Sequence, residues 1–240
     1  MAGVVKVFHS WRCVSDAVVA ALSEPTTDPF VRPILVAPGN AQSRSLLQSL
    51  ARRHGIAAGI DTTTPLGLRE RLEEDLLGIK RENDPWQPGP LALRICRIIE
   101  NNPPGFEVVS AHLEASRRQG VPRATWTTAR QAADAICALA RDSHDVLNAW
   151  ADGATPTTHQ GDTDLAGDPL DPARAWWAPL WRTLLAEPCH VPDPVSRHQL
   201  LVDAILTQSR SEPPIVWFSS TTTAQHDVSL AEALSASHDV

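Results

Sequence analysis

The stretch Ile34-Leu35-Val36-Ala37-Pro38-Gly39-Asn40 decides the expected fold, because a short apolar run is followed at once by turn residues. The apolar run is typical of a buried strand. Ala41–His54 then has helical spacing with cations in its last turn, and Gly55 closes it. A strand, a tight turn and a helix in this order predict a parallel α/β sheet.

The same order of elements is predicted near both ends of the chain. The β-branched run Val4–Phe8 is typical of a strand, and a helical pattern over Val14–Leu22 follows it. Further on, Ile215–Phe218 predicts a strand and Ser229–Leu234 a helix. His238-Asp239-Val240 has the pattern of an incoming strand, which suggests a piece of a longer protein; a short closing edge strand is the alternative.

The middle of the chain has helical spacing, and no strand pattern is found between Asp61 and Pro213. The predicted helices are Pro65–Leu77, Pro90–Ile99, Val108–Arg118, Trp126–Arg141, Asp145–Ala151, Pro172–Ala186 and Pro194–Gln208. The predicted fold class is therefore α/β, a parallel sheet interrupted by a mostly helical insertion. The expected division is a first part of the α/β domain over residues 1–61, a helical subdomain over 62–212 and a return to the α/β domain over 213–240.

The composition of the 240 residues is that of an acidic globular protein. The formal net charge of −7 argues against a broadly basic nucleic-acid coat, and only Lys6 and Lys80 are lysines among 21 cations. The four cysteines lack the spacing of a metal site or a disulfide framework. No apolar run approaches the ~18 residues of a membrane span, and no signal peptide is recognised, so the cytoplasm is the expected location.

A parallel sheet with a helical insertion is the arrangement of P-loop helicases, whose phosphate loop needs glycines and a lysine. The segment His9-Ser10-Trp11-Arg12-Cys13 has neither. The strand Ile215–Phe218 is followed by Ser219-Ser220-Thr221 where an acidic Mg²⁺ ligand would stand. A G-x-S-x-G nucleophile elbow is also missing. The sequence therefore predicts no ATP hydrolysis and no serine-hydrolase chemistry.

Three clusters have two interpretations each. A metal-binding nuclease site or a solvated helix face fits Glu70, Glu73, Glu74 and Asp75, and their helical spacing favours the solvated face. A calcium loop or a solvated loop fits Asp162, Asp164, Asp168 and Asp171, and the solvated loop is favoured because the required pattern of Gly at position 6 with a terminal Glu at position 12 is not met. Base stacking or core packing fits Trp176, Trp177 and Trp181, and the neighbouring leucines favour the core.

Several stretches resemble the RecC family, the gamma subunit of exodeoxyribonuclease V in the RecBCD helicase–nuclease. The most specific are Asp28-Pro29-Phe30, Gly55-Ile56-Ala57-Ala58-Gly59-Ile60-Asp61 and Ala175-Trp176-Trp177-Ala178-Pro179-Leu180-Trp181. Val7-Phe8-His9-Ser10, Ala132-Ala133-Asp134 and Asn148-Ala149-Trp150 occur in the same order. The resemblance spans nearly the whole chain in fragments and covers the N-terminal part of the much longer family members.

The resemblance implies a helicase-like α/β domain whose ATP site has degenerated. His9, Ser10, Trp11 and Arg12 would occupy the former phosphate-loop position. The expectation for this chain is therefore no catalytic residue, no metal and no cofactor.

The resemblance also implies contact with single-stranded DNA through the loop after Ile34–Ala37. The expected DNA-binding residues there are Pro38, Gly39, Asn40, Gln42 and Arg44, where backbone amides at a helix start and an arginine suit phosphates. Without the resemblance, a plain connecting loop is an equal interpretation. Asp134 matches the acid of a family helix beside the Chi-reading surface, and Arg197 lies near a family arginine of the same surface, so both are further expected DNA-binding residues. The aromatic family residues that contact Chi bases are missing from Thr62–Glu70, so a different sequence, or none, is expected to be read.

As a RecC-type subunit, the chain would be a non-catalytic DNA-binding and scaffold element of a RecBCD-type complex in double-strand-break repair and recombination. Its expected partners are single-stranded or forked DNA and RecB-like and RecD-like motor and nuclease subunits. The alternative is a truncated or stand-alone helical interaction module without DNA contact.

Overall fold

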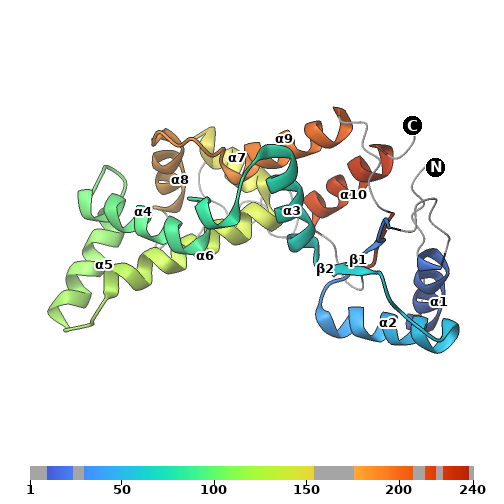
Figure 1. The fold of residues 1–240 in the computed structure, drawn as a ribbon. Coiled ribbons are helices and arrows are strands. Elements are labelled where there is room, and N and C mark those ends of the chain that lie inside the picture. Colours follow the sequence, from blue (N-terminus) through green and yellow to red (C-terminus); the bar gives the residue numbers. More distant parts are fainter. Residues whose placement is uncertain (1–9, 24–29, 154–175, 208–213, 220–223, 238–240) are drawn as a thin grey trace. The chain divides into compact units, whose positions relative to one another are not determined.

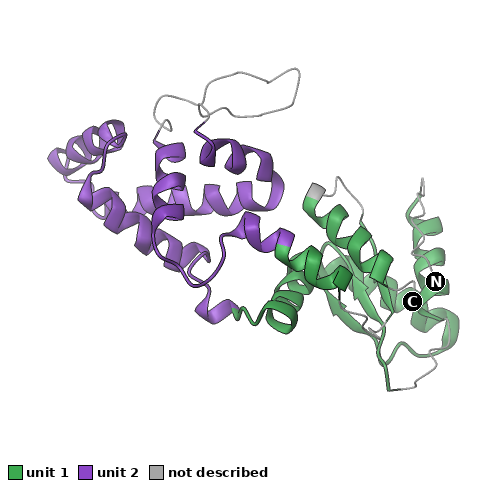
Figure 2. Ribbon diagram, turned by 90° about the horizontal axis from the view of Figure 1, so that it is seen from above, with its two compact units in different colours: residues 1–80, 200–240 green, residues 81–199 purple. Residues whose placement is uncertain are grey.

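The computed structural model describes residues 10–23, 30–153, 176–207, 214–219 and 224–237, and helices dominate them (Figure 1). About 70% of these described residues are α-helical, and three short strands form the sheet. The chain divides into two compact units (Figure 2). Unit 1 comprises residues 1–80 and 200–240, and unit 2 comprises residues 81–199.

Unit 1 contains a parallel sheet in the order β2-β1-β3. The strands are β1 (Ile34–Val36), β2 (Asp61–Thr63) and β3 (Ile215–Trp217), with Leu35 opposite both Thr62 and Val216. The predictions of β1 and β3 are confirmed, but the prediction of no strand after Asp61 is wrong. The sequence Asp-Thr-Thr has no apolar signal because β2 is a half-buried edge strand held by backbone bonds, such as Asp61 N–H to the Pro33 carbonyl at 3.0 Å.

Helices cover both faces of this sheet because β1 alternates its side chains between them. On one face, Leu35 packs with α1 (Trp11–Leu22) and α2 (Asn40–His54). On the other face, Ile34 and Val36 pack with α3 (Pro65–Leu77), the second half of α9 (Pro194–Thr207) and α10 (Gln225–Ser237). The helix α3, expected within the segment 62–212, thus contributes Leu68 and Leu72 to the core of unit 1.

The described residues of unit 2 form helices and the turns between them, without a strand. Its elements are η1 (Arg81–Asn83), α4 (Pro88–Asn101), α5 (Glu107–Arg118), α6 (Ala124–Asp142), α7 (His144–Ala151), α8 (Trp177–Ala186) and the start of α9. The helices α4 and α6 form the central pair, and Ala129, Ala132 and Ala133 line the buried face of α6. Leu91 and Ile95 of α4 are also fully buried, and small side chains on α6 let the two helices approach closely.

The tryptophans of α8 belong to the core of unit 2. Trp176 and Trp181 are buried, and Trp177 is half-buried. The ring centroids of Trp181 and Trp86 are 5.6 Å apart, and those of Trp176 and Phe106 are also 5.6 Å apart. Core packing is therefore confirmed for Trp176 and Trp181, in preference to base stacking.

The predicted fold class, an α/β domain of the P-loop or helicase-like type with a degenerate ATP site, is wrong. The described chain is mostly helical, with strands of three residues each beside helices of up to 19 residues. The strand–turn–helix pattern identifies local units correctly, but it does not fix how large the sheet is. Two predicted strands, Val4–Phe8 and the start at His238–Val240, lie outside the described residues, as do the acids of the suggested calcium loop.

Candidate nucleic-acid interface

The loop Pro38–Arg44 begins at a fixed point, the carboxyl end of β1. The Ala37 N–H donates to the Thr63 carbonyl at 3.0 Å. On the other side, the Phe218 N–H donates to the Val36 carbonyl at 2.8 Å. Both neighbouring strands therefore hold the last residues of β1. The loop starts at the carboxyl end of the parallel strands, where ligands commonly bind.

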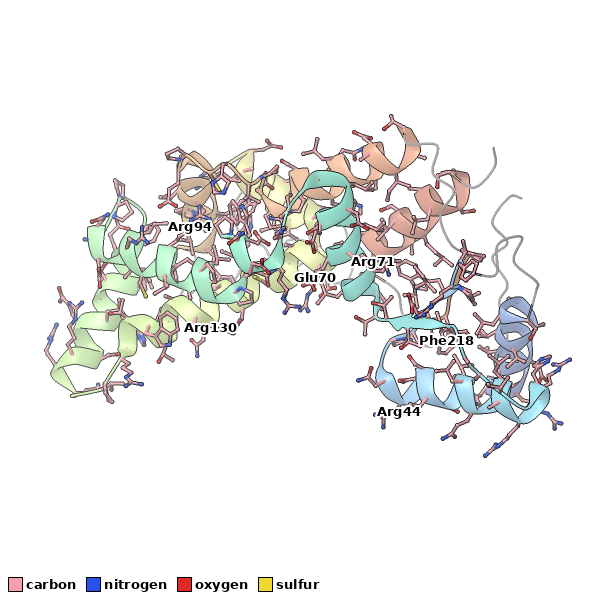
Figure 3. The ribbon with its side chains drawn as sticks, viewed as in Figure 1. Arg44, Glu70, Arg71, Arg94, Arg130 and Phe218 are labelled. Atoms are coloured by element: carbon pink, nitrogen blue, oxygen red, sulfur yellow. The ribbon has the colours of Figure 1, made fainter. Side chains whose placement is uncertain are left out.

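The loop turns directly into α2 and directs most of its predicted residues outward. Ser43 is buried, and its hydroxyl donates to the Gly39 carbonyl at 3.2 Å. Arg44 projects from α2 away from the strands (Figure 3). The other predicted DNA-binding residues here are exposed (Pro38, Asn40) or half-buried (Gly39, Gln42). A ligand at this edge would therefore reach backbone amides, the Asn40 side chain and the Arg44 guanidinium.

The N-terminus of α2 differs from those of α1 and α3 in the described part of unit 1. Ser10 caps α1 by accepting from the Cys13 N–H at 3.3 Å, and Thr64 caps α3 by accepting from the Gly67 N–H at 3.1 Å. The α2 N-cap is Gly39, and no side chain of the described residues caps this terminus. The first amides of α2 thus keep their capacity to bind an anion such as a phosphate.

The residues expected at a degenerate phosphate loop do not form a loop. Trp11 and Arg12 lie in the first turn of α1 and are exposed, and Ser10 is its N-cap, while His9 lies outside the described residues. The Trp11 ring makes an edge contact with Phe218, with 5.3 Å between the ring centroids. The contact places the start of α1 beside β3.

Asp134 and Arg197 belong to unit 2. Asp134 is exposed on α6, and both of its carboxylate oxygens accept from Nε of Arg130 at 3.0 Å. Arg197 lies in the first part of α9 and is 5% exposed. Its Nη1 and Nη2 atoms donate to the two carboxylate oxygens of Asp84, each at 2.8 Å. The roles of both residues in DNA contact stay predictions, and the burial of Arg197 favours a structural role.

Asp84 is the centre of a buried polar cluster that the sequence did not indicate. Its carboxylate also accepts from the backbone N–H of Trp86 at 3.0 Å and from the side-chain amide (Nε2) of Gln87 at 3.2 Å. Burial alone would raise the pKa of Asp84, but hydrogen bonds and charge from Arg197, together with these two donors, outweigh it and lower the pKa. The signal in the sequence is only Asp84-Pro85-Trp86 before a helix, which is also ordinary turn chemistry.

A second buried polar cluster joins α3 and α10 in unit 1. Arg69 Nη2 donates to Asp227 Oδ1 at 2.8 Å, and His226 Nε2 lies 3.2 Å from the same oxygen. Burial would raise the pKa of Asp227, but the hydrogen bond with His226 and the charge of Arg69 lower it on balance. No local pattern in the sequence indicates this cluster, because Arg69 and Asp227 are 158 residues apart.

The acidic residues of α3 are divided between surface and core. Glu74 and Asp75 are exposed, as a solvated face requires, whereas Glu73 is buried.

Within the described residues, no group of three or more His, Cys, Asp or Glu side chains has the arrangement of a metal site. No described helix has both the length and the apolar character needed to cross a membrane.

Comparison with known proteins identifies the class to which this arrangement belongs. Residues 8–240 match the N-terminal domain of RecC. The chain therefore belongs to the RecC family, and the resemblance found in the sequence is confirmed.

Three relatives are RecC subunits of the RecBCD enzyme. Those of Mycobacterium tuberculosis strains CDC 1551 and H37Rv are each 29% identical to the chain over 251 residues. That of Mycolicibacterium smegmatis is 26% identical over 239 residues. Each alignment covers 95% of this chain but only 19–20% of the relative. The chain thus spans about a fifth of the length of the curated relatives it matches.

Proposed function

We propose that this chain acts as the N-terminal part of a RecC-type subunit in DNA repair and recombination. The observation that carries the proposal is the match of residues 8–240 to the RecC N-terminal domain. The relatives are subunits of the RecBCD enzyme, so motor and nuclease subunits of the RecB and RecD types are the proposed protein partners. The role is non-catalytic: the chain would bind DNA and hold it for its partners.

Single-stranded or forked DNA is the proposed ligand, and the loop Pro38–Arg44 is its proposed contact. Three properties support this choice: the amides at the start of α2 have no side-chain cap among the described residues, Asn40 is an exposed hydrogen-bonding side chain, and Arg44 is an exposed cation. Such groups bind phosphates and position a strand without reading its bases. Because few cations take part and the net charge is −7, we expect weak and salt-sensitive binding.

A charge reversal in α2 tests the DNA contact. Binding of fluorescein-labelled dT20 is measured by fluorescence anisotropy at two salt concentrations. We expect Arg44→Glu to weaken binding by about tenfold and to flatten the salt dependence. Arg53→Glu is the matched control, because Arg53 is exposed at the other end of the same helix. Equal effects of the two variants would assign the binding to general charge and contradict a role for the loop.

A capped variant tests the amides themselves. In Gly39→Ser, the new hydroxyl can accept from the α2 amides, and the new Cβ would lie 3.2 Å from Oε1 of Gln42, a flexible side-chain end. We expect unchanged or slightly higher stability together with weaker binding of dT20. Undiminished binding by a folded Gly39→Ser protein would show that these amides do not contact DNA.

The interaction module without DNA contact predicts a different outcome. The protein would then co-purify with the motor and nuclease subunits but would show no binding of dT20 or of a forked duplex. Tryptophan quenching by the oligonucleotide, read in the same titration, separates the two functions.

A further inference from the structure

The connection between α5 and α6 in unit 2 has a tightly defined backbone. At the end of α5, the Gly120 N–H donates to the Arg117 carbonyl and the Val121 N–H donates to the Ser116 carbonyl, each at 3.0 Å. These two bonds and the left-handed Gly120 (φ +70°) form a Schellman motif. These bonds fix the backbone at the end of α5. We call residues 117–126, which connect α5 to α6, the α5–α6 tip.

The tip concentrates positive charge in an acidic protein. Arg117, Arg118 and Arg123 lie within seven residues, and all three are exposed. Arg118 has a partner, Glu114, at 3.4 Å. Arg117 and Arg123 make no ion pair with any described residue. The net charge of the whole chain is −7, so this local excess of cations is not a property of the surface in general.

Two features of position 123 make an arginine there unfavourable for stability. Its backbone is left-handed (φ +57°), a conformation that costs a non-glycine residue about 1–2 kcal/mol. It is also the N-cap of α6, where the helix dipole repels a cation and where its side chain makes no capping bond. Glycine or asparagine would suit the backbone better. The Arg123 carbonyl accepts from the Thr127 N–H at 3.0 Å, as any N-cap residue would, but its side chain makes no ion pair or hydrogen bond with the described residues that would offset these costs.

Apolar side chains lie beside these arginines. Val121 is 47% exposed, although the residue at this place in a Schellman motif usually packs against its own helix. Trp126, in the first turn of α6, is 39% exposed and makes no ring contact with any described aromatic residue. Tryptophan and arginine around an exposed apolar centre are the residue types that dominate protein–protein interfaces.

We propose that the α5–α6 tip docks on an acidic surface of another protein. Arg117 and Arg123 would pair with carboxylates of that partner, and Val121 and Trp126 would be covered by its apolar side chains. A protein fits better than a nucleic acid because Glu114, beside Arg118, would repel a continuous row of phosphates. A protein surface can place its carboxylates opposite Arg117 and Arg123 only. The inference does not depend on DNA binding by the loop Pro38–Arg44.

Photo-crosslinking of the full-length protein in its host cells tests this proposal. Benzoylphenylalanine replaces Val121, and Ile56, which is 69% exposed in unit 1, is the control position. We expect a discrete protein adduct from position 121 whose crosslinked peptide, identified by mass spectrometry, is rich in Asp or Glu. The double variant Arg117→Glu/Arg123→Glu should reduce this adduct at least tenfold. The matched variant Arg52→Glu/Arg53→Glu should leave it unchanged.

Each other result overturns the proposal. A nuclease-sensitive adduct would assign the tip to nucleic acid, and an adduct within the same chain would make it an internal contact. A protein adduct that survives the charge reversal, or maps to a peptide without carboxylates, would exclude an acidic partner surface. No adduct above that of position 56 would exclude docking altogether. Circular dichroism of the purified variants confirms that they remain folded.

Discussion

Arg197 binds Asp84 through two parallel hydrogen bonds of 2.8 Å across 113 residues of sequence. The two side chains are only 6% and 3% exposed. The pair fixes the segment before α4 to the first turns of α9. Asp84 in turn holds the backbone of Trp86, whose indole N–H donates to the Val191 carbonyl at 3.2 Å. One ion pair therefore ties together several parts of unit 2 that are distant in the sequence.

Removing one member of this pair should strongly destabilise the protein. Arg197→Met leaves the Asp84 carboxylate buried without its charge partner, which costs about 3–5 kcal/mol in comparable cases. We expect a matching decrease in the free energy of unfolding, measured by urea denaturation followed by tryptophan fluorescence. Arg118→Ala is the control, because the Arg118–Glu114 pair is 77% and 64% exposed and should contribute less than about 1 kcal/mol. A small effect of Arg197→Met would contradict a structural role for the pair.

Acid should destabilise the protein partly through Asp84 and Asp227. Their pKa values are lowered in the folded state, so their contribution is complete above the unfolded pKa of about 3.9 and is lost as the pH falls through the folded value. We therefore expect the free energy of unfolding to decrease steeply below about pH 4. In Asp227→Asn, the slope in this range should be shallower, because one linked proton is missing. Identical slopes for both proteins would exclude Asp227 as a source of the acid sensitivity.

The sequence predicts local structure in this chain better than it predicts the architecture. The bounds of α3 are those of the predicted helix Pro65–Leu77, since Thr64, Pro65 and Gly78 mark both ends by local chemistry. The strand β2 was missed because backbone hydrogen bonds to β1, not apolar side chains, define it. The sheet's modest size follows from tertiary packing, which a strand–turn–helix pattern does not specify.

The candidate site shows the same division between local and distant information. The loop Pro38–Arg44 joins β1 to α2 as the strand–turn–helix pattern predicts, because one strand and one helix determine its place. Arg197 is expected to contact DNA because it lies near a family arginine, but its side chain is paired with Asp84, which no local pattern connects with it. Only the folded structure reveals that its guanidinium has a carboxylate partner inside the protein.

A glycine should be required at position 55 because of its backbone conformation, not because a larger side chain would lack room there. Gly55 closes α2 in the left-handed conformation (φ +80°), and an added Cβ would meet no atom within 4 Å. Gly55→Ala should therefore lower the free energy of unfolding by about 1–2 kcal/mol through backbone strain. Gly89, in the first turn of α4, also has open space around its Cβ position but no positive φ. Gly89→Ala lacks this strain and meets only crowding with the ring of the following Pro90, so it should cost clearly less than Gly55→Ala; a similar loss in both variants would contradict the strain argument.

The cysteines should differ greatly in their reactivity with iodoacetamide. Burial, and to a lesser extent the charge of Asp134, raises the pKa of the Cys137 thiol to about 11. Its Sγ also lies 3.5 Å from the Trp86 carbonyl, which it contacts as a donor. Cys13 and Cys189 are exposed.

At pH 8 very little Cys137 is thiolate, the reactive form, so its alkylation should be at least about 100-fold slower than that of the two exposed cysteines. Time-resolved mass spectrometry of the alkylated peptides measures these rates, and in urea all the cysteines should react at similar rates. Rapid labelling of Cys137 in the folded protein would instead indicate that the segment around Trp86 opens readily.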